Sequence, residues 1–505
     1  MTRERSPLVA GSGYRGRLNG LQLLGLAVLL GAVCAQAAVA EDPDAGPMTP
    51  DEKAQESAEP ATQPMALQSL IPTLPDYTGD IWSRSVLTGD WGGARTELAS
   101  HGILFDMQVT QFLQQNAKGG KNTSGAMEYG GSADYWLKLD TARMGLWPGG
   151  LITLHGETQF GRSTNSNTGS FMPANFKSLL PVPNDPGLTT LSEFYIMQAL
   201  SEKVVLAAGK MDLTALGDRN AFAGDATHLT QFMNTAFNIN PVLFSAAPYT
   251  ALGAGVILIP TEWLQISTLV SDNDPDGAAT TTGFNTAFHG RDWATVMQEY
   301  AFTLKLFDKV GHQRFGWFWT SRDFSEFEPD SRVSLPVRRV GLPSIGGRLV
   351  PRPLRKLRIG STLFDTREVN TRPDNWAMYY NFDQFLYNEP EDPTQGFGVF
   401  GRFGFAPTEG NPFQEFYSIG LGGKGAIPRR DQDTWGAGYY CTRTENDLGS
   451  ALGVSTEQGV EVFYSIEVTP WFRVTPDIQV IFEPADGYNG RETAIVYGVR
   501  GQISL

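Results

Sequence analysis

The sequence offers few side chains whose types and spacing would support catalysis. Its five histidines are scattered, with no pair at a metal-binding spacing and no nucleophile elbow around a serine. They are His101, His155, His228, His289 and His312. The pattern therefore predicts that the protein is not an enzyme and holds no catalytic zinc.

Two further motifs match known patterns only in part. Residues 420–425 fit the dinucleotide-binding pattern G-x-G-x-x-G, but the chain continues into Pro428 instead of a helix. Residues 272–277 resemble the start of a calcium loop, yet the twelfth position is Gly283, where a bidentate Glu is required. We expect a curved glycine-rich strand at the first, an acidic external loop or weak cation site at the second, and no cofactor.

The composition narrows the class of protein. The chain has 505 residues, 56 glycines, 31 prolines and a net charge of −15, with 41% hydrophobic and 18% charged residues. These values disfavour a helical membrane protein and a disordered polyelectrolyte. An acidic chain without a long basic tail also argues against nucleic acid as a partner.

The first 75 residues differ from the rest. Arginines precede an apolar run over residues 21–33 that ends at Ala38-Val39-Ala40, which predicts a signal peptide over residues 1–40. Residues 41–75 are acidic and rich in Ala and Pro, so we expect a disordered periplasmic segment. Residues 76–505 then form one domain. Cys441 is the only cysteine after the predicted cleavage site, which excludes an internal disulfide.

Apolar and polar residues alternate along this domain. In residues 103–110 the odd positions are apolar, whereas Asp106, Gln108 and Thr110 are polar. The same period of two returns in residues 134–140, 152–159, 299–305, 397–404 and 495–505. Each segment is thus expected to be a strand with one apolar and one polar face.

Two folds can use such strands. A soluble β-sandwich would turn the apolar faces into a core, whereas a transmembrane barrel turns them to lipid around a water-filled lumen. The aromatic residues Phe315, Trp317 and Trp319, with Trp435 and Tyr439, fit the interfacial girdles of a barrel but could also be core residues. The lack of disulfides in so long a secreted domain favours a transmembrane antiparallel β-barrel.

The polar phase of these strands supplies the candidate pore residues. They would line the lumen and exchange hydrogen bonds with a passing solute. The candidates are Asp140, Glu157, Gln159, Lys305, Arg402, Gln479, Arg500 and Gln502, and His155 is expected on the same face.

Several stretches resemble the carbohydrate-selective porin family of OprB type. The N-terminal signature is residues 87–95, Leu-Thr-Gly-Asp-Trp-Gly-Gly-Ala-Arg, and further similarity runs through residues 208–212, 248–253 and 396–402. The C-terminal block around residues 420–433, 464–484 and 498–500 is the most specific. The resemblance covers residues 82–505 and implies a 16-stranded outer-membrane barrel, preceded by a short helix, that passes sugars.

The resemblance implies a bacterial outer-membrane porin for passive, carbohydrate-preferring diffusion of small sugars. An unselective diffusion porin and an outer-membrane barrel enzyme are the alternatives. Outer-membrane lipid and lipopolysaccharide are the expected surroundings, and a homo-oligomer is left open.

One basic stretch stands out in the acidic chain. Residues 331–360 contain eight Arg or Lys residues, Arg338 and Arg339 among them, and no acid. The stretch either contacts anionic lipopolysaccharide outside the barrel or folds into the lumen. In the lumen, its guanidinium groups would face Glu157, Glu193 and Glu299 and create an electric field across the pore.

Overall fold

The computed structural model describes residues 74–181, 187, 189–224, 229–245, 249–273, 294–322, 324–325, 371–372, 374–407, 411, 413–444, 456–482, 484 and 492–505. The predicted signal peptide and most of the predicted acidic segment therefore lie outside the described residues. The same holds for the basic stretch 331–360, including Arg338 and Arg339, and for residues 274–283 of the acidic loop.

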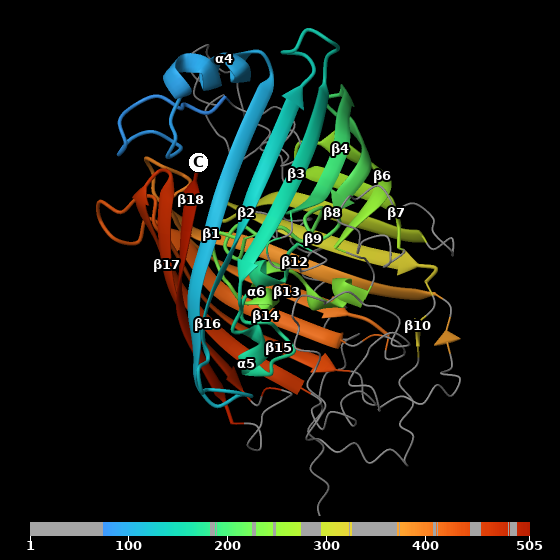
Figure 1. Cartoon of the computed structure of the whole chain (residues 1–505). Helices are drawn as coiled ribbons and strands as arrows, with labels where there is room; N and C mark the ends of the chain where they lie inside the picture. The colour runs from blue at the N-terminus through green and yellow to red at the C-terminus, as the bar shows by residue number, and fades with distance from the viewer. Residues whose placement is uncertain are drawn as a thin grey trace, which may run out of the picture.

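Sixteen strands form one closed antiparallel barrel, in which β18 returns to pair with β1 (Figure 1). The N-terminal half contributes β1 (Ile103–Lys118), β2 (Met127–Asp140), β3 (Gly150–Gly161), β4 (Thr189–Ser201), β5 (Val204–Asp212), β6 (Thr250–Thr261), β7 (Leu264–Asp272), β8 (Ala294–Leu306) and β9 (Lys309–Thr320). The C-terminal half contributes β12 (Asn375–Asn388), β13 (Gly396–Phe405), β14 (Phe413–Lys424), β15 (Thr434–Thr444), β16 (Thr456–Thr469), β17 (Phe472–Phe482) and β18 (Ala494–Ser504). A separate pair, β10 (Phe324–Ser325) and β11 (Thr371–Arg372), lies between β9 and β12 in sequence. The predicted 16-stranded antiparallel barrel is confirmed.

The two ends of the barrel are built differently. At one end the strands are joined by tight turns such as residues 202–203, 262–263 and 307–308. In the last of these, Phe307 and Asp308 both have positive φ, the conformation that two-residue hairpins favour. At the other end the connections are long, for example residues 162–188 and 213–249. We call these the short-turn end and the long-loop end.

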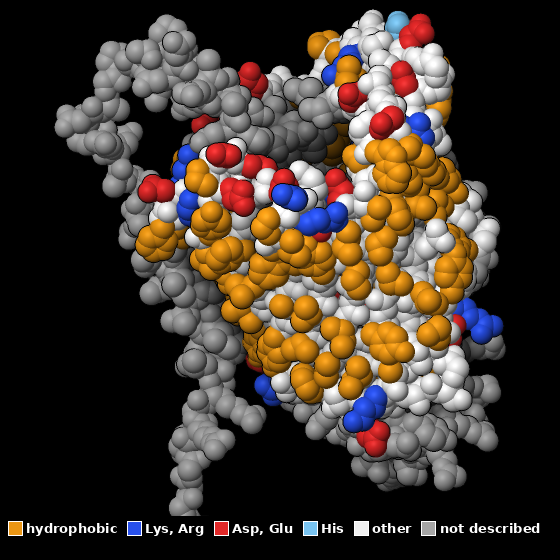
Figure 2. Space-filling model, turned by 90° about the vertical axis from the view of Figure 1, so that its left-hand side faces the viewer, with side chains coloured by type: hydrophobic (Ala, Val, Ile, Leu, Met, Phe, Trp, Pro, Cys, Tyr) orange, Lys and Arg blue, Asp and Glu red, His pale blue; other side chains and the backbone are white. Residues whose placement is uncertain are grey.

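The alternation predicted from the sequence places apolar residues on the outer wall. Phe105, Leu113, Tyr497 and Val499 are among the exposed large hydrophobic side chains, whereas Arg500 on the opposite phase of β18 is only 2% exposed. Figure 2 shows hydrophobic side chains covering this wall beneath a rim of charged side chains. The wall therefore has the apolar outside and polar inside of a barrel in lipid.

A short N-terminal segment lies across the short-turn end. It contains the 3₁₀ turn η1 (Trp91–Gly93) and helix α4 (Ala94–Ser100), on the same end of the barrel as the C-terminus (Figure 1). The predicted N-terminal helix is therefore present. None of the described helices has the length and apolar composition of a membrane-crossing helix.

Arg95 fastens this segment to the closure of the barrel. Its guanidinium donates to the main-chain oxygen of Phe105 at 2.7 Å and to that of Leu505 at 3.1 Å. The Leu505 amide in turn donates to Met107 on β1 at 2.8 Å. Arg95 is 2% exposed, so these charge-assisted bonds, together with the Asp106 carboxylate 3.6 Å away, offset the cost of burying its charge.

Two of the long connections fold into the barrel. The first inward segment (residues 162–181) contains α5 (Asn165–Thr168) and η2 (Lys177–Leu179). The second inward segment (residues 213–224 and 229–245) contains α6 (Thr235–Asn238) and η3 (Pro241–Ser245). Together with inward-facing wall residues, such as Phe400, Phe416, Tyr440 and Phe463, they form the largest buried apolar cluster of the described residues.

Close aromatic packing seats the second inward segment on the wall. The Phe237 ring stacks on Phe232 with centroids 4.5 Å apart and meets Tyr440 edge-on at 5.9 Å. On the wall beneath it is Gly438, where an added Cβ would lie 2.5 Å from the Phe237 ring. A glycine is required there because any side chain would push the segment away from β15.

The register of β18 can be tested at one position. Val499 is apolar, faces outward and lies near the middle of the strand, opposite Leu113. Replacing Val499 with Arg should cost about 2 to 4 kcal/mol of unfolding free energy if the position lies near the bilayer midplane. Urea unfolding in lipid vesicles, followed by tryptophan fluorescence, measures this cost, with Val499→Leu as the control. Equal stability of the Arg variant and the control would show that this face does not contact lipid.

Candidate functional site: a lumen narrowed by two inward segments

Glu457 on β16 holds the first inward segment. Its carboxylate accepts hydrogen bonds from the amides of Phe171 at 2.7 Å and Met172 at 3.1 Å, and from the hydroxyl of Ser170 at 2.6 Å. The side chain is fully buried. One carboxylate on the wall thus accepts the hydrogen bonds of residues 170–172, which do not pair with a strand.

Glu461 lies four residues after Glu457 on the same strand and holds the second inward segment. Its carboxylate accepts from the amides of Met233 at 2.6 Å and Asn234 at 2.8 Å. Because side chains on a strand alternate, residues four apart face the same side, and both acids point into the lumen. One strand therefore anchors both segments.

A buried ion pair adds a third anchor. The Arg402 Nε lies 3.1 Å from each carboxylate oxygen of Asp218, and Arg402 also donates to the main-chain oxygens of Asp218 and Phe237. The Asp218 amide donates to Glu299 at 2.8 Å, and Tyr379 donates to the same Glu299 oxygen at 2.6 Å. The start of the second inward segment is thus tied to β8, β12 and β13.

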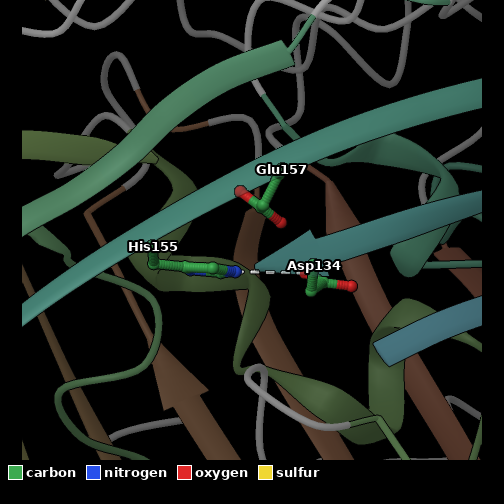
Figure 3. Close-up of side chains that lie close together, drawn as sticks. All are labelled: Asp134, His155 and Glu157. Carbon is green, nitrogen blue, oxygen red and sulfur yellow. Dashed lines mark hydrogen bonds and ion pairs between the residues drawn. The ribbon is translucent and has the colours of Figure 1, made fainter. Parts of the chain in front are cut away.

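An ionic cluster joins the first inward segment to the opposite wall. Asp134, His155 and Glu157 lie together on β2 and β3 (Figure 3). The two ring nitrogens of His155 lie 3.1 Å from Asp134 and 3.0 Å from Glu193. Since carboxylates only accept, this geometry favours a doubly protonated ring.

Lys177 of η2 supplies the central cation of this cluster. Its ammonium lies 2.7 Å from Asp134 and 3.4 Å from Glu157. Burial alone would lower the pKa of Lys177, but the two carboxylates outweigh it and raise the pKa to about 12. Lys177 therefore stays charged across the physiological pH range and loses its proton only as the pH rises through about 12.

The cluster also meets the minimum geometry for a metal site. One ligand atom each from Asp134, His155 and Glu157 lie within 4.8 Å of one another. The lysine ammonium, however, already provides the positive charge that a metal would bring, and the His155 nitrogens are both engaged. The arrangement therefore fits a loop anchor better than a metal centre.

A cavity of about 530 Å³ lies on the short-turn side of the second inward segment. The N-terminal segment borders it through Tyr77 and Val86, and the second inward segment through Leu216 and Arg219. Its volume falls within the range of small-molecule sites. The wall contributes groups of both charges, aromatic rings and hydroxyls, among them Lys138, Glu193, Tyr195, Asp212, Glu299 and Tyr379.

Most of the predicted pore residues are buried on the inner face, where several hold the inward segments. Gln159 donates to the main-chain oxygen of Ser178, and Gln479 donates to that of Ala174 at 2.8 Å. Arg500 donates to the main-chain oxygen of Gln231 at 2.7 Å. Glu157, Glu193, Glu299 and Arg402 make the contacts described above, and Gln502 is also buried. Their contact with a solute stays a prediction.

Two predicted residues lie away from the narrowed region. Asp140, at the end of β2, accepts from the amides of Ala142 and Arg143 and caps a turn at the short-turn end. Lys305 is exposed next to the β8–β9 turn. The alternation of apolar and polar residues put both on the inward face, but it does not tell how far a residue lies from either end of the barrel.

Sequence reasoning missed the residues that hold the segments. Lys177 and Asp218 lie in stretches without alternation, and Glu457 and Glu461 were not distinguished from other polar wall positions. A signal was available for the last two: both lie on the inward phase of one strand, and a carboxylate buried there needs hydrogen-bond donors.

Comparison with known proteins identifies the family. The model of the "Carbohydrate-selective porin, OprB family" matches residues 124–505. The chain belongs to this family. The family and the barrel place the protein in the bacterial outer membrane, with its short turns on the periplasmic side, and indicate a channel and not an enzyme.

Relatives agree with this assignment. Porin B of Pseudomonas aeruginosa is 20% identical over 445 residues, which cover 82% of this chain and 90% of that protein. Porin AaxA of Chlamydia pneumoniae is 28% identical over 148 residues, so the match spans about a third of its length. The high-pH structure of Pseudomonas putida OprB is 18% identical with a TM-score of 0.70, covering 85% of this chain and all of that chain. The similarity to that structure concerns the fold.

The anchoring role of Glu461 predicts a change in channel noise. Replacing Glu461 with Gln removes two charge-assisted hydrogen bonds, each worth about 1.5 to 3 kcal/mol, and turns an amide donor toward two main-chain donors. The second inward segment should then leave the wall more often. Single-channel recording should show higher mean conductance and more open-channel noise.

Glu467→Gln is the matched control for this variant, because Glu467 lies on the same strand but pairs with Arg473 at the short-turn end. Traces of the Glu461 variant that match those of the control in conductance and noise would contradict the anchoring role.

Removing the cation at Lys177 should change ion selectivity. Lys177→Met removes one positive charge beside Asp134 and Glu157, so the lumen becomes more negative and should prefer cations more strongly. Reversal potentials under a salt gradient measure the change. Lys305→Met is the control, since an exposed charge at the rim is screened within about 10 Å at 0.1 M salt. An equal shift in both variants would mean that Lys177 does not lie at the narrow part.

Proposed function

We propose that this porin allows passive, carbohydrate-preferring diffusion of small sugars across the outer membrane. The observation that carries the proposal is the division of the lumen. The two inward segments and the wall of β12 to β16 form an apolar filling, whereas the cavity by β2 to β9 keeps hydrogen-bonding groups of both charges.

Some of the charged side chains that line this cavity have a partner of opposite charge. Glu193 faces His155 at 3.0 Å, and Arg314 faces Asp383 at 3.3 Å. Such pairs exert a weaker net field on an ion than isolated charges would. They still offer donors and acceptors that can replace the water bound to a sugar hydroxyl.

The filling also limits the size of the solute. A closed barrel of 16 strands leaves an aqueous channel unless loops narrow it. Both inward segments are held at several points, so the remaining passage is expected to keep its width during transport. A passage of fixed width whose wall forms weak hydrogen bonds with hydroxyl groups favours small sugars. This agrees with the description of the family.

Swelling of proteoliposomes tests the proposal. Vesicles containing the full chain are diluted into isotonic solutions of monosaccharides, disaccharides, amino acids or salts, and the initial swelling rate is followed by light scattering. Monosaccharides should enter faster than amino acids of similar size. Equal rates for all solutes of one size would support the unselective diffusion porin instead.

A further inference from the structure

The helix at the short-turn end has three distinct faces. Arg95 and Ala99 are buried against the barrel. Trp91 lies in η1, before the helix, with a φ of 51°, and Leu98 lies on α4; their side chains are 46% and 41% exposed. The remaining face carries the exposed polar residue Glu97. The segment formed by η1 and α4 therefore has two large apolar side chains that the barrel does not cover.

Contacts fix the rotation of this helix. The Arg95 guanidinium is held by the main-chain oxygens of Phe105 and Leu505 and lies over the Tyr77 ring at 4.3 Å. It also lies 5.0 Å from the centre of the Trp91 ring. Because a rotation of the helix would break these contacts and separate Arg95 from Asp106, which lies 3.6 Å from the guanidinium, the orientation of the segment is fixed.

The exposed apolar face continues the outer wall of the barrel. The rings of Trp91 and Phe105 are 6.4 Å apart. Phe105 is on the outward phase of β1, the same phase as the exposed Leu113. Figure 2 shows hydrophobic side chains running along this wall toward the end of the barrel that carries charged residues. Through Trp91, the apolar side chains of this segment therefore continue the outer wall.

We propose that η1 and α4 lie in the headgroup region of the periplasmic leaflet, with Trp91 and Leu98 in contact with phospholipid. Tryptophan favours this depth because its ring is apolar and its N–H can reach water or headgroups. Glu97 on the other face stays in water. The segment thereby attaches the junction of β1 and β18 to the membrane. This role does not depend on which solute passes through the lumen.

Site-directed spin labelling tests the proposal. Single cysteines replace Leu98, Glu97 or Val499 in a background where Cys34 and Cys441 are changed to Ala, and each is labelled with a nitroxide. The labelled porin is reconstituted into phosphatidylethanolamine and phosphatidylglycerol vesicles. Power saturation then compares accessibility to oxygen, which concentrates in lipid, with accessibility to a water-soluble nickel chelate.

The label at Leu98 should resemble the one at Val499, with an oxygen-to-nickel ratio several-fold higher than at Glu97. Equal ratios at Leu98 and Glu97 would place the face in water and overturn the proposal. Shielding of the Leu98 label from both reagents would indicate a protein partner or a second copy, which also overturns it.

A second measurement avoids the cysteine variants. Brominated phospholipids quench tryptophans that touch lipid, so wild type and Trp91→Phe are compared in vesicles with and without bromine. The intensity lost on bromination, at equal protein concentration, should be smaller in Trp91→Phe than in wild type. An unchanged quenched intensity would show that Trp91 does not reach the lipid and would overturn the proposal.

Discussion

Buried main-chain N–H groups of the inward segments are the constraint on which this pore depends. A segment that crosses the lumen leaves strand pairing behind, so its amides need acceptors that the barrel must supply. Glu457 and Glu461 supply them from β16, each to a different segment. The width of the passage therefore follows from the placement of two acids on one strand.

The same anchoring divides the lumen into two halves with different chemistry. Aromatic residues of the segments pack against Phe400 and Phe463, and this apolar part excludes water. On the opposite side, Lys177 joins the first inward segment to an ionic cluster on β2 and β3. The polar residues near the cavity thus serve both as supports for the segments and as a surface for the solute.

The family resemblance implied the 16-stranded barrel. Alternation in the sequence was enough to predict strands with one apolar and one polar face and the inward phase of Glu157 and Arg500, because strand periodicity is a local property. It could not predict the inward segments. Asp218 meets Arg402 across 184 residues of sequence, and Lys177 meets Asp134 across 43. Both lie in stretches without periodicity, and their partners become neighbours only after the barrel closes. Glu157 and Arg500 are therefore buried on the inner face as predicted, but the contacts of the wall residues with the inward segments were not foreseen.

The central claim is that sugars interact with a passage narrowed by anchored segments. Titration of a monosaccharide into a planar bilayer containing single channels tests it most directly, with the ion current recorded at each concentration. The account predicts a reduction of the current that saturates with sugar concentration and is accompanied by excess noise from individual binding events. A current that falls only in proportion to the bulk conductivity of the solution, without saturation or added noise, would contradict it.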